Sequence, residues 1–263
     1  MRVKSLIRST VVVAACSLVC SWTHAEPSFE TAEHKSVPLD LFDVPDGMEV
    51  TIWASSPLFF NPTNIDIDFK GRIWVAEGVR YRGHHARRPE GDRIMVLEDK
   101  DGDGKADSSH MFVQESLLVA PLGVAVLDNK VVVSQPPHLL VYTDADRDLV
   151  FDESKGDTRE ILLTGFNGQN HDHSLHSVTA GPDGKWYFNS GNCGGMFTDK
   201  SGKTFRIFGD YRPGPIGPFS FPHDAGKYAG MPSDDGHVYV GGFTVRMNPD
   251  GTNCEITGHG YRN

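Results

Sequence analysis

A hairpin pattern that recurs three times constrains the fold of this 263-residue chain more than any other feature. Each copy combines a short strand pattern, a tight turn and a second strand pattern rich in valine or aromatic residues. The turns centre on Gly71, Asn129 and Gly184, at intervals of 58 (129 minus 71) and 55 (184 minus 129) residues. The three copies are NIDIDFKGRIWVAEG (64–78), PLGVAVLDNKVVVSQ (121–135) and LHSVTAGPDGKWYFNSG (175–191). A regular period of this length indicates repeated structural units.

Further strand patterns, RIMVLED and LLVYTDAD, follow the first two hairpins, and no stretch of a dozen residues has a convincing helical stripe. One strand pair followed by another in each repeat is typical of a β-propeller blade. A β-sandwich also uses short strands and turns, but it does not require the same hairpin at near-constant spacing. We therefore predict an all-β fold, a β-propeller of which this chain covers about three blades. We expect the chain to be the N-terminal part of a longer propeller, with about six blades when complete.

The first 25 residues have the pattern of a signal peptide. Three basic residues precede an apolar run, VVVAACSLVCSW, and the sequence THA at its end suits a signal peptidase. The run is shorter than the ~20 residues that cross a bilayer, which argues against a membrane anchor. We expect export to the periplasm or another extracytoplasmic compartment and no membrane span in the mature chain. The predicted organisation is a signal peptide (1–25), a polar lead-in (26–47) and the propeller domain (48–263).

The charge of the chain is acidic, at -10 from 25 basic and 35 acidic residues. Removal of residues 1–25 takes away three basic residues and no acidic ones, which leaves -13 (22 minus 35). This balance disfavours nucleic acid and anionic membranes as partners. The same cleavage leaves Cys193 and Cys254, which either pair in an oxidising compartment or remain two buried thiols.

A loop of alternating aspartates, DKDGDGKAD, follows the strand pattern RIMVLE. Four of them occupy positions 1, 3, 5 and 9 of a loop of the EF-hand type: Asp99, Asp101, Asp103 and Asp107. Gly104 is at position 6, where the chain must turn sharply, but His110 stands where an EF-hand has a bidentate glutamate. The pattern predicts a weaker or structural calcium site. The alternative is that the Asp-Gly pairs only make turns.

A second aspartate-rich loop repeats this spacing at an offset of 45 residues (144 minus 99). Its members are Asp144, Asp146, Asp148 and Asp152. Because Leu149 replaces the turn glycine, we interpret this loop as a degraded copy that also contributes calcium ligands.

The segment RYRGHHARRPEGDR (80–93) is basic within an acidic protein. Its arginines could bind an anionic partner or a polysaccharide, but we favour a solvated insertion loop.

Several motifs resemble those of known dehydrogenases. The run NHDHSLHSVTAGPDGKWYFNSGN and the terminal GYRN are similar to the propellers of soluble quinoprotein glucose dehydrogenases and glucose/sorbosone dehydrogenases. More closely, LFDVPDGMEVTIWA, GRIWVAEGVRYR, GDRIMVLEDKDGDGKAD and LLTGFNGQNHDHSLHS resemble a bacterial family of membrane-bound dehydrogenase domains. That family often precedes helical repeats and a haem domain with a CxxCH motif. The resemblance extends from about residue 41 to residue 263.

The resemblance implies a site. A histidine ten positions before the aspartate of GPDG acts as general base, which maps onto His173, and the RN pair that contacts pyrroloquinoline quinone (PQQ) maps onto Arg262 and Asn263. The calcium that polarises the quinone in those enzymes would lie on chain beyond Asn263. His171, His173 and His176 with Asp172 are alternatively metal ligands or a hydrogen-bonded polar cluster at the propeller mouth.

The leading hypothesis is an exported quinoprotein-dehydrogenase-like propeller that oxidises a sugar or alcohol with PQQ and passes electrons to a haem domain absent from this chain. The alternative is a non-catalytic, calcium-stabilised propeller that binds carbohydrate or a protein partner.

Overall fold

β-Strands make up most of the regular structure in the computed structural model, which describes residues 37–262 except 169–171, 210–214, 217–218 and 221–223. The helical segments among these residues are short 3₁₀ turns: η2 (Leu39–Leu41), η3 (Tyr81–Gly83), η4 (His85–Arg87), η5 (Glu153–Lys155) and η6 (Ala225–Tyr228). Within the described chain, no helix has the length and apolar character needed to cross a membrane. The predicted all-β fold class is confirmed. The predicted signal peptide lies outside the described residues.

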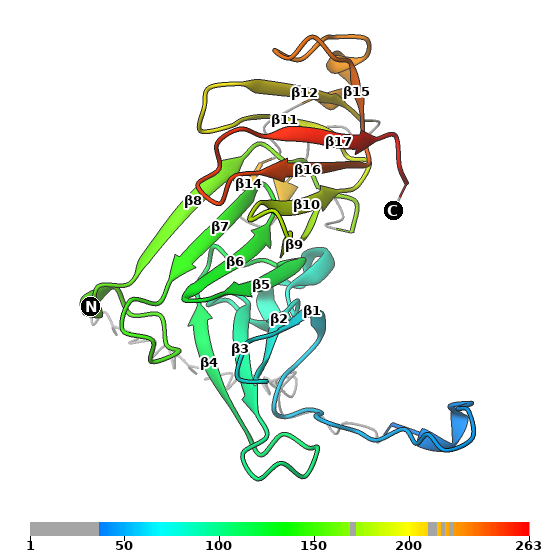
Figure 1. Cartoon of the computed structure of the whole chain (residues 1–263), viewed down its shortest axis with the longest axis vertical. Helices are drawn as coiled ribbons and strands as arrows, with labels where there is room; N and C mark the ends of the chain where they lie inside the picture. Colours follow the sequence, from blue (N-terminus) through cyan, green and yellow to red (C-terminus); the bar gives the residue numbers. More distant parts are fainter. Residues whose placement is uncertain (1–36, 169–171, 210–214, 217–218, 221–223, 263) are drawn as a thin grey trace, which may run out of the picture. The chain divides into compact units, whose positions relative to one another are not determined.

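The first two predicted repeats form two four-stranded antiparallel sheets with the same simple order (Figure 1). In each sheet, every strand pairs with the next one along the chain. The first sheet contains β1 (Pro62–Ile67), β2 (Ile73–Glu77), β3 (Arg93–Glu98) and β4 (Ser108–Gln114). The second contains β5 (Gly123–Leu127), β6 (Lys130–Gln135), β7 (His138–Thr143) and β8 (Thr158–Thr164). This is the meander of a propeller blade.

The third sheet has the same four-stranded design but carries an insertion between its second and third strands. Its strands are β9 (Leu175–Ala180), β10 (Trp186–Ser190), β16 (Phe243–Met247) and β17 (Glu255–His259). The insertion forms a separate three-stranded sheet and a two-stranded hairpin. These contain β11 (Gly195–Thr198), β12 (Thr204–Phe208), β13 (Pro215–Ile216), β14 (Phe219–Ser220) and β15 (Tyr239–Val240). The three predicted hairpins are therefore the first two strands of three blades.

Neighbouring blades are joined along their first strands, because β5 contacts both β1 and β9. Side chains of β1 take part in this junction. Asn64 Oδ1 accepts a hydrogen bond from Val124 N at 2.9 Å, and Asp66 Oδ2 accepts one from Val126 N at 2.7 Å. Adjacent first strands are what a propeller places on its inner side, so the arrangement is propeller-like.

Alternation along the strands gives each blade two packing faces. Trp74 of β2 packs in one apolar cluster with Val131 and Val133 of β6. Val132, between them, points the other way and packs with Phe188 of β10. Each large apolar side chain that is fully buried in this way contributes roughly 1.5–3 kcal/mol.

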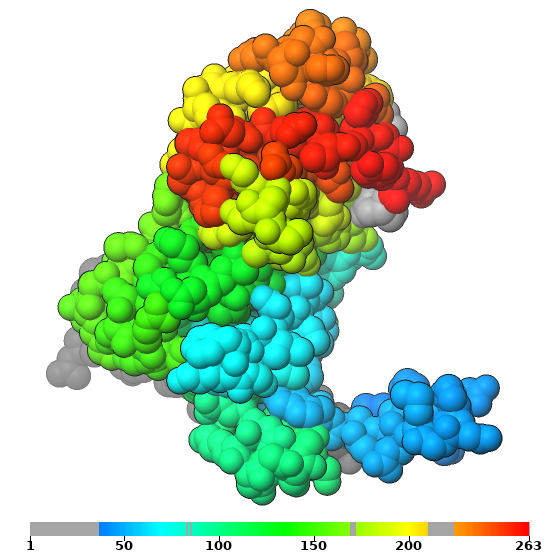
Figure 2. Space-filling model, in the orientation of Figure 1, coloured from blue at the N-terminus to red at the C-terminus, as the bar shows by residue number. Residues whose placement is uncertain are grey.

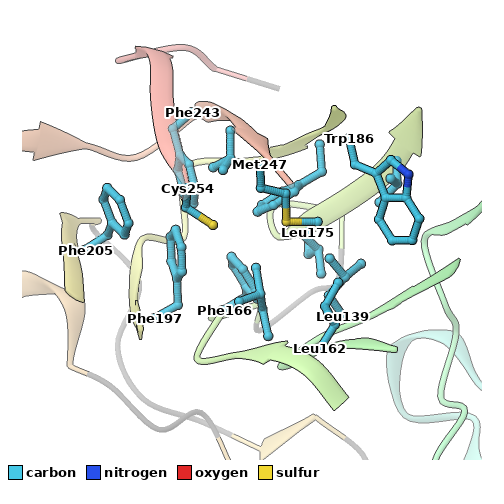
Figure 3. Packing of buried hydrophobic residues seen from close by; sticks show 14 of the residues in the cluster. Leu139, Leu162, Phe166, Leu175, Trp186, Phe197, Phe205, Phe243, Met247 and Cys254 are labelled. Atoms are coloured by element: carbon cyan, nitrogen blue, oxygen red, sulfur yellow. The ribbon is translucent and has the colours of Figure 1, made fainter. Parts of the chain in front are cut away.

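The largest apolar cluster joins the second blade, the third blade and the insertion (Figure 3). The rings of Phe166 and Phe197 stack with centroids 5.1 Å apart, and those of Phe197 and Phe205 stack at 4.9 Å. Met247 and Cys254 complete the same cluster from the third blade (Figure 3). The insertion is therefore packed into the core and is not a loose appendage.

One face of the first blade packs against the segment that immediately precedes β1. Val75, Met95 and Leu97 pack against residues that precede β1, including Trp53 and Phe59. An apolar pocket of about 360 Å³ lies between these segments. Val37, Leu39 and Phe42, which belong to the predicted lead-in, also line this pocket.

Cys193 and Cys254 are buried thiols, and no disulfide joins them. Of the two alternatives that the sequence left open, the structure supports two buried thiols over a disulfide. Burial raises the pKa of Cys254 to about 12, so this thiol is protonated at neutral pH.

Candidate functional site

The three blades have two distinct ends. At one end, the first strand of each blade begins beside the end of its second strand, as the pairs Pro62↔Glu77, Gly123↔Ser134 and Leu175↔Ser190 show. The last strands of the first two blades, β4 and β8, also end here, and β5 and β9 of the following blades begin here, so we call it the crossover end. The opposite end, the hairpin end, carries the tight turns and both aspartate-rich loops, which connect β3 to β4 and β7 to β8.

His173 lies at the crossover end, just before the inner strand β9. Its half-buried side chain is 2.8 Å from Asn192, measured from Nδ1 to Oδ1. The backbone carbonyl of His173 also accepts a hydrogen bond from Cys193 N at 3.1 Å. Because an amide oxygen can only accept, the side-chain contact places the proton of the neutral imidazole on Nδ1 and the lone pair on Nε2.

His176 is also half-buried, and its Nε2 lies 3.3 Å from the backbone oxygen of Asp172. Burial lowers the pKa of His176, although the contact with Asp172 partly opposes this effect. The imidazole is therefore neutral at about pH 7, with its Nε2 proton donated to the carbonyl. The third histidine of the predicted cluster, His171, lies outside the described residues.

An ion pair joins the first blade to the segment that precedes the third. Arg82 Nη2 lies 3.1 Å from Asp172 Oδ2, and both side chains are exposed. Arg82 Nε also donates to Tyr81 Oη at 3.0 Å. An exposed pair of this kind contributes little to stability, because solvent screens the two charges. Its main effect is therefore positional, because it brings Arg82 beside the segment that carries His173.

The basic segment 80–93 is held by a buried charge network. Glu77, which is fully buried, lies 2.7 Å from Arg93 Nε and also contacts Arg88. Asp92 accepts hydrogen bonds from the backbone N–H groups of Arg80 and Ala120. The interpretation of this segment as a solvated loop is therefore wrong for Arg80 and Arg88. Both residues are buried: Arg80 Nη1 donates to the backbone carbonyl of Ser116 and Arg88 donates to Glu77, whereas Arg80 Nε has no hydrogen-bond partner among the residues that the structure describes.

Arg262 follows β17 at the crossover end and is exposed. A ladder of backbone hydrogen bonds fixes the preceding residue: Tyr261 N donates to Gly242 O at 2.9 Å, and Gly242 N donates to Gly191 O at 2.9 Å. A side chain at Gly242 would collide with the Tyr261 carbonyl, because an added Cβ would lie 1.7 Å from that oxygen. Arg262 is thus at the same end of the third blade as His173, and Asn263 lies outside the described residues.

In the first aspartate-rich loop, the structure brings three of the four predicted ligands together. Carboxylate oxygens of Asp99, Asp101 and Asp107 lie within 4.8 Å of one another. Asp103 instead accepts a hydrogen bond from Lys105 N at 2.8 Å. Both carboxylate oxygens of Asp99 accept from the backbone, at Gly102 and Gly104. The loop stands out from the end of the first blade (Figures 1 and 2).

The second aspartate-rich loop gathers a different set from the one its spacing predicted. Oxygens of Asp144, Asp146 and Asp157 lie within 4.8 Å of one another. The other two predicted ligands are engaged elsewhere. Asp148 forms an ion pair with Lys155, and Asp152 caps η5 by accepting from Ser154 N at 2.9 Å.

Asp157 was missed by the sequence reasoning because it lies outside the nine-residue spacing of the motif. Its two carboxylate oxygens accept hydrogen bonds from Ala145 N at 2.7 Å and Asp152 N at 2.8 Å, which fold the loop back on itself. Burial raises the pKa of Asp144, and the nearby carboxylates of Asp157 and Asp148 raise it further. The one available signal was an acidic residue immediately before the strand β8.

No curated protein matches the chain. Among the solved structures, one that matches is described as the iodide structure of Trichoderma reesei Carbohydrate-Active Enzymes Family AA12, at 16% identity and a TM-score of 0.43. The match covers 60% of this chain and 36% of that one, so the chain spans about a third of its length. A family model described as a domain of unknown function, DUF7133, matches residues 34–240, and the chain therefore belongs to the DUF7133 family.

Proposed function

We propose that this domain is the substrate-oxidising part of an exported sugar or alcohol dehydrogenase of the quinoprotein type. The observation that carries the proposal is the contact between His173 Nδ1 and Asn192 Oδ1 at the entry to the inner strand β9. It orients the ring and selects the tautomer in which Nε2 is basic. A general base with these properties is what oxidation of a hydroxyl group requires.

The proposed reaction has a simple balance. The substrate hydroxyl proton moves to His173 Nε2 as the carbon–oxygen double bond forms. The hydrogen on the carbon that bears the hydroxyl group leaves as hydride, with two electrons. PQQ supplies the two-electron acceptor when it is bound. Asn192 acts through His173 and is a positioning residue, since its oxygen holds the proton on Nδ1 throughout.

The residues at the crossover end suit an anionic quinone. Arg262 is exposed after β17, and a guanidinium group matches carboxylate and carbonyl oxygens with its forked donors. Arg262 and Asn263 would hold PQQ through such contacts. The proposal includes an extracytoplasmic location, which follows from the signal-peptide pattern of residues 1–25, and a haem c domain as the electron acceptor, which follows from the motif resemblance.

The test is a titration of the full-length, calcium-loaded protein with PQQ, followed by a panel of aldoses and alcohols, with the quinone absorbance as readout. We expect tight binding and substrate-dependent reduction. His173→Ala should lower kcat by roughly 10²–10⁴-fold and leave quinone binding intact. Arg262→Ala should weaken quinone binding instead.

Two further variants sharpen the assignment. His138→Ala is a matched control, because His138 lies at the crossover end of the second blade with Nδ1 2.8 Å from Thr164 Oγ1. It should keep full activity. Asn192→Leu should lower kcat and shift the pH profile, since it removes the tautomer preference but not the imidazole. Failure of the full-length protein, folded and calcium-loaded, to bind the quinone would refute the proposal. Saccharide binding without reduction would identify the alternative, a non-catalytic propeller.

A further inference from the structure

We propose that Asp144, Asp146 and Asp157 form a calcium site in the β7–β8 loop, with ligands other than those of the EF-hand spacing. This loop lies at the hairpin end, opposite His173, so the proposal is independent of the proposed oxidation. Its first basis is convergence: one carboxylate oxygen from each residue lies within 4.8 Å of the others.

The second basis is an unsatisfied buried oxygen. Asp144 is only 3% exposed, and its Oδ2 accepts a hydrogen bond from Leu149 N at 3.0 Å. Its Oδ1 is buried and has no hydrogen-bond partner among the residues that the structure describes. A buried carboxylate oxygen without a donor is costly, and a bound cation removes that cost. Asp99, the residue at the corresponding position of the first aspartate-rich loop, has no such unsatisfied oxygen, because both of its carboxylate oxygens accept hydrogen bonds from the backbone.

The separations suit calcium. Calcium–oxygen distances are about 2.3–2.6 Å, so two ligand oxygens on opposite sides of the ion lie about 4.6–5.2 Å apart and other pairs lie closer. The three oxygens, all within 4.8 Å, can therefore surround one ion. The donor set is oxygen only, which selects a hard cation over zinc or copper. Magnesium fits less well, because it demands near-ideal octahedral geometry at about 2.0–2.1 Å.

The surrounding backbone explains why this set converges. Arg147 and Leu149 adopt left-handed conformations, at φ 61° and 68°, which curl the loop around Asp144. Asp157 bonds to Ala145 N and Asp152 N and so returns the chain to the start of the loop. The ion would join the end of β7 to the beginning of β8, where Thr143 pairs with Thr158. Its role is to fasten the two outer strands of the second blade.

The roles of Asp148 and Asp152 allow an experiment to distinguish the proposed ligand set from the set that the EF-hand spacing predicts. Asp148 is neutralised by Lys155, and Asp152 caps η5. If the EF-hand spacing governed binding, Asp148 would be a ligand and Asp157 would not. The structure predicts the reverse, so the pair Asp157→Asn and Asp148→Asn separates the two possibilities.

The experiment uses the full chain, with calcium chloride as the probe. Calorimetric titration gives affinity, and amide hydrogen exchange of the peptide that spans 144–158 reports on this loop separately from loop 99–107. We expect calcium to slow exchange in this peptide, with magnesium less effective at equal concentration. Asp157→Asn should weaken this response at least about tenfold in calcium concentration, and Asp148→Asn should leave it unchanged.

Asp146→Asn is a second ligand variant, which is needed in case Asp157→Asn disturbs folding. Asp146 is exposed and accepts a 3.3 Å hydrogen bond from Asp148 N. This variant should fold normally, as judged by far-ultraviolet circular dichroism, and also weaken the response at least about tenfold. The proposal is overturned if calcium leaves exchange of this peptide unchanged in the natural sequence. It is equally overturned if Asp148→Asn abolishes the response while folded Asp146→Asn retains it.

Discussion

Glu77→Gln tests whether the buried charge network anchors the segment that carries Arg82. Glu77 has no exposed surface, and its Oε1 accepts hydrogen bonds from Phe60 N at 2.7 Å and Arg93 Nη2 at 3.1 Å. Its Oε2 accepts from Arg93 Nε at 2.7 Å and also from Arg88. The glutamine is nearly isosteric but carries no charge, and its amide nitrogen would face guanidinium donors.

The expected cost is large because two arginines lose their counter-ion. Arg88 is 4% exposed in its side chain, and its remaining acidic neighbour, Asp92, is 3.8 Å away. Breaking a buried ion pair from one side typically costs about 3–5 kcal/mol. Since whole domains are stable by about 5–15 kcal/mol, this loss would remove a large fraction of the free energy of unfolding.

The assay is urea unfolding followed by tryptophan fluorescence, with the free energy taken from the midpoint and the slope. Glu160→Gln is the matched control. Glu160 pairs with Lys200 at 2.9 Å, but the two side chains are 56% and 43% exposed, so the expected loss is about 0–1 kcal/mol. Loss of the network should also speed tryptic cleavage after Arg82 and Arg87. A Glu77→Gln protein as stable as the Glu160→Gln control would refute the reasoning.

Two further predictions concern titration and thiol reactivity. Burial raises the pKa of Asp92 to about 6, against 3.8 for an ordinary aspartate, and hydrogen bonds from Ala120 N and Arg80 N only partly offset this. A raised folded pKa gives stability that is present below pH 3.8 and is lost as pH rises through about 6. Asp92 should therefore contribute a loss on the order of 3 kcal/mol across that window, measurable as a fall in the urea midpoint, and Asp92→Asn should lack it. A variant with the same pH slope as the natural protein would contradict this assignment. For the thiols, Cys193 and Cys254 are buried and not joined by a disulfide, so alkylation read by peptide mass should be absent in the native protein and complete at both positions in guanidinium chloride. Protection of these thiols in the denatured, unreduced protein would instead reveal a disulfide.

The sequence predicted those features whose physical cause is local. Alternating side chains around the turns at Gly71, Asn129 and Gly184 indicated hairpins, because a period of two and a tight turn are properties of adjacent residues. The spacing of Asp99, Asp101 and Asp107 likewise placed three carboxylates within reach of one another. The near-constant interval between the hairpins then predicted repeated blades, since each blade begins with the same hairpin.

Tertiary structure decided which distant residues meet. Asp157 joins Asp144 because two backbone hydrogen bonds fold the loop back, and no motif spacing encodes that return. Arg82 reaches Asp172 across 90 positions of sequence because β1, β5 and β9 lie side by side. The sequence did not predict that the strands between β10 and β16 form a separate sheet, since their composition resembles that of the other strands. The antiparallel order also decided that His173 and the aspartate-rich loops occupy opposite ends of the blades. Each antiparallel strand reverses the direction of the chain, so the end at which a residue lies depends on how many strands precede it in its blade. Sequence patterns give that number only approximately, whereas the hydrogen-bonded pairing of the strands shows it directly.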